Sequence, residues 1–255
     1  MCISGTDIAV IYYNDEYLDM KSYSFIFCLI LCLLPAGFQQ VFAQKTGYNE
    51  WFFWSHQQRI SERWQFSADV QVRSADRLRY INTLLIRPGI GYKIADNQTL
   101  TLGYTYFGTW DKDNDLNVYA YENRIFEQYQ IENEIWRTEL TNRLRYEQRF
   151  IGPHKGGDFF AQRLRYYVNA QIPLRTDPLF TQGIYLSVQN ELFLNVQGKD
   201  RVNSRVFDQN RSYAGPGYRF NEKLDIEAGY MFRYQIEENF NRRNNIFQLV
   251  VKTSF

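Results

Sequence analysis

Arginine and glutamate alternate along one segment of this sequence, and their spacing raises the first chemical question. Residues 135–150, IWRTELTNRLRYEQRF, place charged or polar side chains at every second position, with mostly apolar or aromatic ones between them. The charged members of this row, with two arginines of the segment 163–172, are Arg137, Glu139, Arg143, Arg145, Glu147, Arg149, Arg163 and Arg165. Such a row either forms a ladder of salt bridges, because buried charges are normally paired, or favours anions, as arginine rings do in pores.

The two hypotheses depend on how these segments pair. The motif RLRY occurs in both, and we expect them to lie on neighbouring antiparallel strands. One possible register sets Arg143 across from Arg165. The same register sets Arg145 across from Arg163. Like charges directly opposite each other are destabilising, so the ladder needs acids, of which the candidates are Glu139, Glu147, Glu191, Asp225 and Glu227.

Hydrolysis by a serine and a histidine would need the two side chains within hydrogen-bond reach. The chain has two histidines. His56 follows Ser55 directly, but neighbouring residues of a strand point to opposite faces. His154 lies in the loop sequence GPHKGG, which has no serine. We therefore expect no catalytic residues.

Cofactor and metal sites are also poorly supported by the sequence. Two separated histidines do not make a zinc site, and the acids of residues 110–117 lack the glycine and closing glutamate of a calcium loop. The Gly-x-Gly-Tyr sequences at 89–92 and 215–218 are followed by a turn and a strand, whereas a phosphate-binding glycine loop requires a helix. We expect no metal, no cofactor and no nucleic-acid partner.

The elements that position these residues are strands, because alternation with period two recurs along the chain. The segments 63–73, 163–172 and 224–236 each divide into an apolar row and a polar row, while the facing of 122–132 stays open. Eleven windows fit strands: 48–57, 63–73, 80–93, 98–108, 121–132, 135–150, 159–172, 183–196, 211–220, 224–236 and 244–255.

The amino-terminal region indicates export. Met20-Lys21, the apolar run 25–34 and the sequence VFAQ predict a signal peptide over residues 20–43, cleaved after Ala43. Residues 1–19 carry four acids, which suits no signal peptide, so we interpret them as a start-site artefact, with a genuine extension as the alternative. Cleavage would remove all three cysteines and leave residues 44–255.

Turns and loops alternate along these strands in a way typical of outer-membrane barrels. Short turns are expected near 59–62, 94–98, 133–134 and 221–223, and longer loops include 109–120. The chain ends on Phe255 after a strand with apolar residues at every second place, which resembles an assembly signal for such barrels. Lipid then covers the apolar rows and the charges line the interior. The sequence thus predicts an all-β, transmembrane antiparallel β-barrel of about twelve strands, or ten, because bacterial barrels are even-numbered.

Several stretches carry a resemblance to a known family. EWFFWSHQQRISERWQFSADVQVR, RPGIGY, YENRIFEQ and the barrel-type end resemble the outer-membrane β-barrel family of Bacteroidota catalogued as domain of unknown function 2490. The resemblance implies this fold and location but no activity. We expect a structural or interaction component or a narrow pore of the bacterial outer membrane, with membrane lipid and the barrel-assembly machinery as its partners. The alternative is an enzyme that acts on lipid or lipopolysaccharide from a site in the barrel interior.

Overall fold

The structure, a computed structural model, describes residues 44–75, 77–113, 116–152 and 157–255. The predicted leader over residues 1–43, its cysteines and His154 lie outside these ranges. None of the described residues belongs to a helix long and apolar enough to cross a bilayer.

The described residues form eleven strands and one short 3-10 helix, and each predicted window corresponds to one strand. Their bounds are β1 (Gln44–Arg59), β2 (Trp64–Ala75), β3 (Tyr80–Ala95), β4 (Gln98–Asp113), β5 (Leu116–Ile135), β6 (Thr138–Ile151), β7 (Phe159–Thr176), β8 (Gly183–Gln197), η1 (Lys199–Arg201), β9 (Phe207–Asn221), β10 (Leu224–Ile236) and β11 (Asn241–Ser254).

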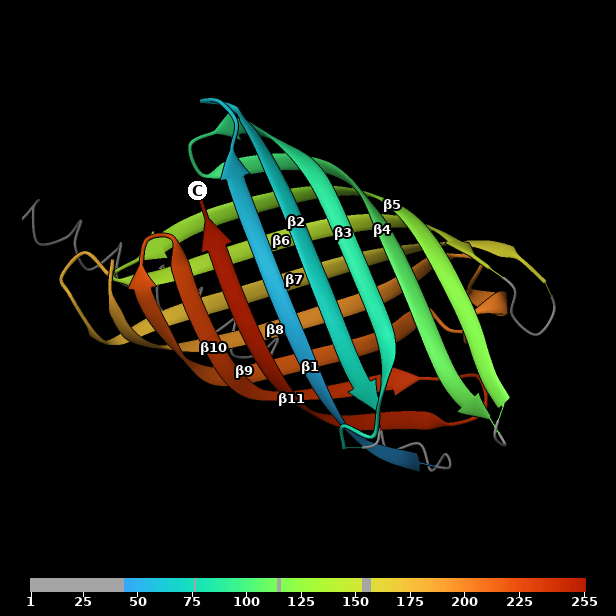
Figure 1. Cartoon of the computed structure of the whole chain (residues 1–255). Coiled ribbons are helices and arrows are strands. Elements are labelled where there is room, and N and C mark those ends of the chain that lie inside the picture. The colour runs from blue at the N-terminus through green and yellow to red at the C-terminus, as the bar shows by residue number, and fades with distance from the viewer. Residues whose placement is uncertain (1–43, 76, 114–115, 153–156) are drawn as a thin grey trace, which may run out of the picture. The chain divides into compact units, whose positions relative to one another are not determined.

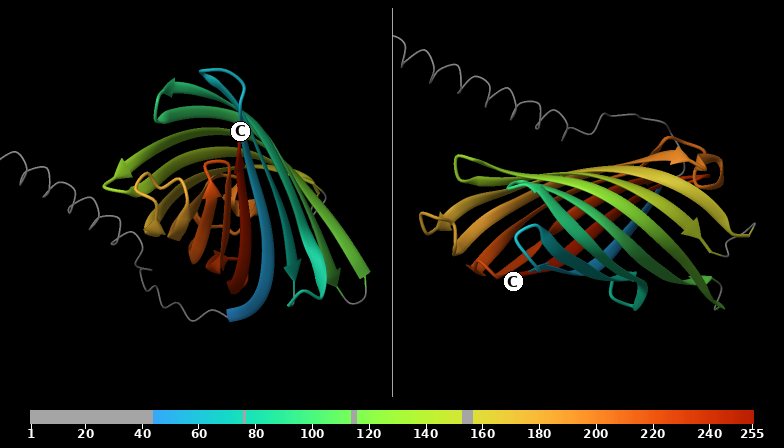
Figure 2. Two further views of the ribbon diagram at one scale, coloured as in Figure 1. Left: turned by 60° about the vertical axis from the view of Figure 1, so that its left-hand side comes forward. Right: turned by 90° about the horizontal axis from the view of Figure 1, so that it is seen from above.

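These strands close into one barrel. Each strand pairs antiparallel with its neighbours in the sequence, while β1 and β11 pair in parallel, with their arrowheads at the same end in Figure 1. Figure 2 shows the same tilted wall of strands from two further directions. The all-β barrel is confirmed, but it has eleven strands in place of the twelve, or ten, that we expected. An odd number in up-and-down order leaves the first and last strands running the same way, so only parallel pairing can close it.

Two predicted connections lie elsewhere. The turn expected at 133–134 and the strand expected to start at 135 are both wrong, because β5 continues to Ile135 and the chain turns at Trp136 and Arg137. Trp136 has a φ of 58° there, the positive value that a type II′ hairpin turn has at its first central residue. The loop expected over 109–120 is also shorter, since β4 and β5 stay paired up to Asp113 and Leu116.

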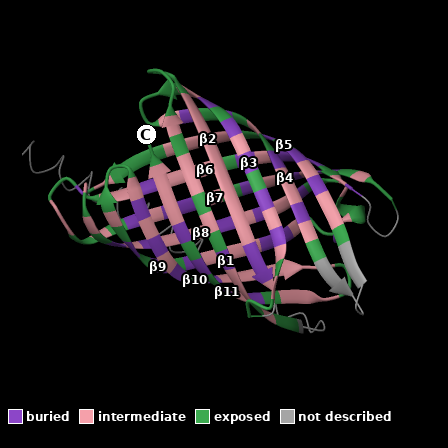
Figure 3. Cartoon of the chain, viewed as in Figure 1, coloured by how far each residue is buried: buried purple, intermediate pink, exposed green. Residues whose placement is uncertain are grey.

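Burial alternates along the strands with period two, which Figure 3 shows as changing colours. On β6 the side chains of Leu144 and Phe150 are exposed, while those of Arg145, Glu147 and Arg149 are buried. The predicted inversion, with apolar rows outside and charged rows inside, therefore holds for this strand. Leu140 belongs to the outward row by parity, yet it is only 5% exposed.

The interior is crowded enough to require glycine at some inward positions. The two Gly-x-Gly-Tyr sequences lie on β3 and β9, each in a hairpin with the next strand. A Cβ atom at Gly217 would collide with the ring of Tyr185, a fully buried residue of β8. Glycine there lets a large interior side chain approach the wall.

Candidate functional site

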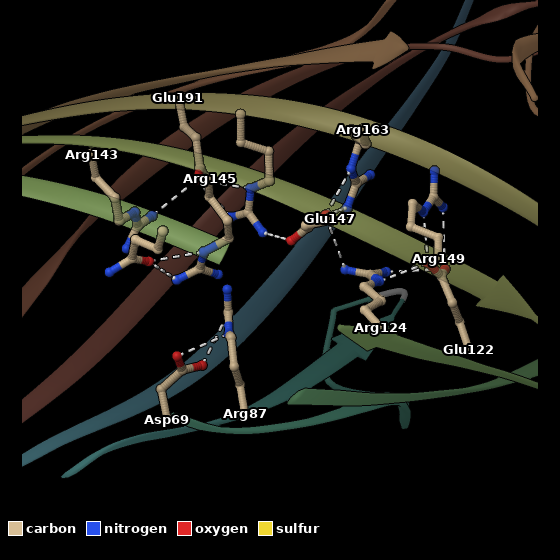
Figure 4. Close-up of polar contacts among 12 residues, drawn as sticks. Asp69, Arg87, Glu122, Arg124, Arg143, Arg145, Glu147, Arg149, Arg163 and Glu191 are labelled. Atoms are coloured by element: carbon tan, nitrogen blue, oxygen red, sulfur yellow. Dashed lines mark hydrogen bonds and ion pairs between the residues drawn. The ribbon is translucent and has the colours of Figure 1, made fainter. Parts of the chain in front are cut away.

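A fully buried carboxylate, that of Glu147 on β6, is shared by arginines of the barrel interior; Glu147 is 0% exposed. Arg163 Nη2 lies 2.6 Å from Glu147 Oε2, and Arg165 Nη1 lies 2.5 Å from Oε1. Arg124 is on the neighbouring strand β5, and its Nη1 lies 4.0 Å from Glu147 Oε2. Figure 4 shows Arg124 and Arg163 converging on Glu147. One buried acid thus serves arginines from both adjacent strands.

Further ion pairs extend this arrangement along the wall. Arg163 also reaches Asp208 on β9 at 2.9 Å. Glu122 accepts hydrogen bonds from Arg124 and from Arg149, at 2.7 and 2.6 Å. The two arginine pairs of Glu122 are buried and bidentate, which is the geometry that makes guanidinium–carboxylate contacts strong.

A second group gathers around Glu191 of β8. Its Oε1 is 2.6 Å from Arg165 Nη2 and 3.0 Å from Arg143 Nη2. Arg145 is different, because it donates to the amide oxygen of Gln128, at 2.9 and 2.5 Å, and stacks on Phe126. On the facing wall, Arg87 pairs with Asp69 at 3.0 Å and points toward this group (Figure 4).

The pairing of β6 with β7 is shifted by two residues from the register that sets Arg143 across from Arg165. Arg145 lies across from Arg165, and Glu147 lies across from Arg163. Odd numbers do face odd numbers, as expected, but the shift brings a carboxylate opposite an arginine. Opposite charges in directly facing positions are stabilising, so the observed register carries part of its own neutralisation.

Two residues of the predicted row lie apart from this network. Arg137 is exposed in the β5–β6 turn and donates to Thr176 Oγ1 and the carbonyl of Asp177, at 2.8 and 2.6 Å. Glu139 pairs with Arg219 of β9 at 2.8 Å. The structure therefore groups Arg143, Arg145, Glu147, Arg149, Arg163 and Arg165, and places the other two toward the end of the strand.

Aromatic side chains inside the barrel were missed by the sequence prediction. Phe193 on β8 is buried against the guanidinium groups of Arg163, Arg165 and Arg211, which lie 4.6 to 5.1 Å from its ring centre. Arg143 covers Tyr167 in the same way at 4.2 Å. The signal was present as parity, because these aromatic residues occupy the polar rows of their strands. Cation–π contacts of this kind stabilise a cation in place of water.

The network narrows the interior to a small central cavity of about 150 Å³. Every strand from β2 to β10 contributes a side chain to its lining. The lining includes eight arginines, namely Arg73, Arg87, Arg124, Arg149, Arg163, Arg165, Arg211 and Arg233. Glu122 is the acid that lines it. Guanidinium groups therefore make up most of the polar lining, and those of Arg87, Arg124, Arg149, Arg163 and Arg165 are paired with carboxylates.

The remaining candidates lie on the seam between β1 and β11. His56 Nδ1 is 2.9 Å from Thr253 Oγ1, and its ring lies against Trp54 and Phe255. Phe255 is tied to β1 by backbone hydrogen bonds to Gln57 and from Arg59. Among the described residues, no group of three or more His, Cys, Asp and Glu side chains could hold a metal ion.

Comparison with known proteins assigns the chain to a family. A family model described as "Protein of unknown function (DUF2490)" matches residues 49–244. The chain belongs to this family. An uncharacterised protein of Methylorubrum extorquens is 25% identical to this DUF2490 chain over 167 residues, which cover 65% of the chain and 69% of the relative. No solved structure matches the chain.

Proposed function

We propose that this protein is a bacterial outer-membrane barrel, exported by a signal peptide over residues 20–43, that serves as a non-enzymatic structural or interaction component. The observation that carries the proposal is the inverted polarity of the wall. Outward apolar side chains that are exposed on several strands include Phe52, Ile86, Leu102, Leu144, Tyr166 and Phe247. A contiguous surface of this kind marks contact with a membrane or a partner, and a closed barrel leaves no unpaired strand edge in lipid.

The side chains inside the barrel favour a narrow or closed passage rather than an open channel. Interiors of eight-stranded barrels are filled by side chains, while barrels of sixteen or more strands hold aqueous channels. Eleven strands lie between these sizes. Here the ion pairs of Glu147 and the aromatic ring of Phe193 occupy the centre. We therefore propose a passage for small ions at most, with the ladder as its main obstacle.

Cell fractionation tests the location. The protein expressed with its leader should sediment with outer-membrane markers and should need detergent for extraction. The protein expressed from residue 44 should aggregate in buffer and fold when detergent is added. A monomeric, folded form of residues 44–255 in buffer without detergent would contradict the proposal.

Conductance measurements in planar bilayers test the closed interior. The matched variants Phe193→Ala and Phe160→Ala remove the same side chain from the inside and the outside of the barrel, since Phe193 is buried and Phe160 is exposed. We expect small conductance for the natural protein, a clear increase for Phe193→Ala and no change for Phe160→Ala. Large, stable channels formed by the natural protein would contradict a narrow interior.

A further inference from the structure

Three arginines that the sequence prediction did not single out surround one indole inside the barrel. Arg73 on β2, Arg211 on β9 and Arg233 on β10 lie with their guanidinium carbons 3.9, 5.2 and 5.6 Å from the ring centre of Trp51. Trp51 on β1 is 6% exposed and packs with Tyr213, so its ring faces the interior. We call Arg73, Arg211 and Arg233 the arginine triad.

The triad is short of anionic partners among the described residues. Arg73 donates from Nη2 to the neutral amide of Gln71 at 2.6 Å, and its strongest electrostatic neighbours are all arginines. Arg233 donates to the neutral amide of Asn244, at 2.8 Å. The acids nearest to Arg233 in electrostatic effect are Glu237 and Asp208, which pair with Arg242 and Arg163. This environment contrasts with that of Arg163, which holds two carboxylates.

Arg211 has a carboxylate nearby, but that carboxylate is already engaged. Its Nη1 is 3.9 Å from Glu191 Oε2, whereas Arg165 and Arg143 lie 2.6 and 3.0 Å from the other oxygen of Glu191. In all three arginines of the triad the Nε–H group is buried and meets no hydrogen-bond acceptor. A buried donor left without an acceptor is destabilising, and more so when the group is charged.

The side chains of the triad also line empty space. The triad belongs to the lining of the central cavity of about 150 Å³, together with other guanidinium groups. That volume is below the range of roughly 300–1,000 Å³ typical of sites for drug-sized ligands. The cavity thus suits a compact group that brings negative charge and several acceptor oxygens, and guanidinium groups are well shaped for oxyanions.

We propose that the arginine triad forms a binding site for a compact tetrahedral oxyanion of the phosphate type, either free phosphate or the phosphate group of a small ester. Trp51 packs against the guanidinium groups of this site and is not part of the cavity lining. The anion accepts hydrogen bonds from the guanidinium groups of the triad and neutralises mutual repulsion among them. The salt-bridge ladder around Glu147 and Glu191 stays intact, and its members Arg163 and Arg165 line the same cavity. The inference concerns the barrel interior and does not depend on the membrane in which the barrel resides.

The test uses Trp51 as an internal reporter. The purified barrel in detergent is titrated with sodium phosphate while tryptophan fluorescence is recorded, with sodium chloride of equal ionic strength as the control. The Trp51→Phe variant identifies the part of the signal that comes from this residue, since the chain has five tryptophans. Calorimetric titration of both proteins measures binding without the reporter, and glycerol 3-phosphate in a second titration distinguishes an ester from the free ion.

We expect a saturable response to phosphate that chloride does not produce and that Trp51→Phe loses. Arg73→Gln and Arg233→Gln should each weaken phosphate binding about tenfold or more, because each removes a charged hydrogen bond. The control Arg175→Gln removes an exposed charge outside the cavity and should bind like the natural protein.

Three results would overturn the site. One is the absence of saturable phosphate binding by calorimetry to the natural protein. Another is unchanged binding in both Arg73→Gln and Arg233→Gln, each verified as folded by circular dichroism. The third is an equal loss in Arg175→Gln, which would mean that bulk charge causes the response. Tighter binding of glycerol 3-phosphate than of phosphate would assign the site to an ester, and the reverse order would assign it to the free ion.

Discussion

Replacement of Glu147 by Gln tests how strongly the interior network holds the barrel. The variant keeps the shape of the side chain but removes the charge that Arg163 and Arg165 contact at 2.6 and 2.5 Å. Breaking a buried ion pair by removing one partner costs about 3–5 kcal/mol, because the other charge stays buried. Both arginines keep a second carboxylate, Asp208 or Glu191, so we expect a loss near the lower end, about 3 kcal/mol.

The assay is denaturant unfolding of the barrel in detergent, followed by tryptophan fluorescence, with the free energy of unfolding taken from midpoint and slope. Glu127→Gln is the matched control, because Glu127 is exposed on the outer face and contacts the amide of Gln148 at 3.1 Å. The control should change the free energy of unfolding by about 0.5 kcal/mol or less. Equal effects of the two substitutions would refute the idea that the interior carboxylate stabilises the barrel.

Three further predictions concern the wall and its closure. Leu144→Arg should cost about 2–4 kcal/mol in a bilayer, while Thr141→Arg, which faces inward across from an acid, should cost much less in the same vesicle-based unfolding assay. Deletion of Phe255 removes two backbone hydrogen bonds to β1 and should lower the yield of folded barrel, measured by protease resistance. An unchanged yield would contradict the role of Phe255 in closing the barrel. Gly217→Ala should cost about 1–3 kcal/mol by overpacking against Tyr185, and thermal unfolding at the natural midpoint would argue against that contact.

The sequence predicted the strands well because alternation is a local property. Each of the eleven windows corresponds to a strand, and the inward position of the β6 charges follows from which row is apolar. Strand number and closure are not local, however. The expectation of an even number rested on the even strand counts of bacterial barrels, whereas here β1 and β11 pair in parallel and close an odd number.

The site could be predicted only in part, for the same reason. The charged rows that contain Arg163, Arg165 and Glu147 could be recognised in the sequence. Which charges face each other depends on the register of β6 and β7, and a shift of two residues changes every facing pair. The arginine triad lies on β2, β9 and β10, and Trp51 lies on β1, so barrel closure alone brings them together. An aromatic residue on the polar row of a strand is the signal that would have pointed to Trp51.

We propose that the barrel stands in lipid with its apolar rows outward. Quenching of tryptophan fluorescence by brominated lipids tests this orientation. It compares two single-tryptophan proteins that retain either Trp54 or Trp51, which both lie on β1 and are 36% and 6% exposed. In vesicles the account predicts strong quenching of Trp54 and little or no quenching of Trp51. Equal quenching of Trp54 and Trp51 would contradict this orientation. So would the absence of quenching at both residues in protein that is recovered with the vesicles.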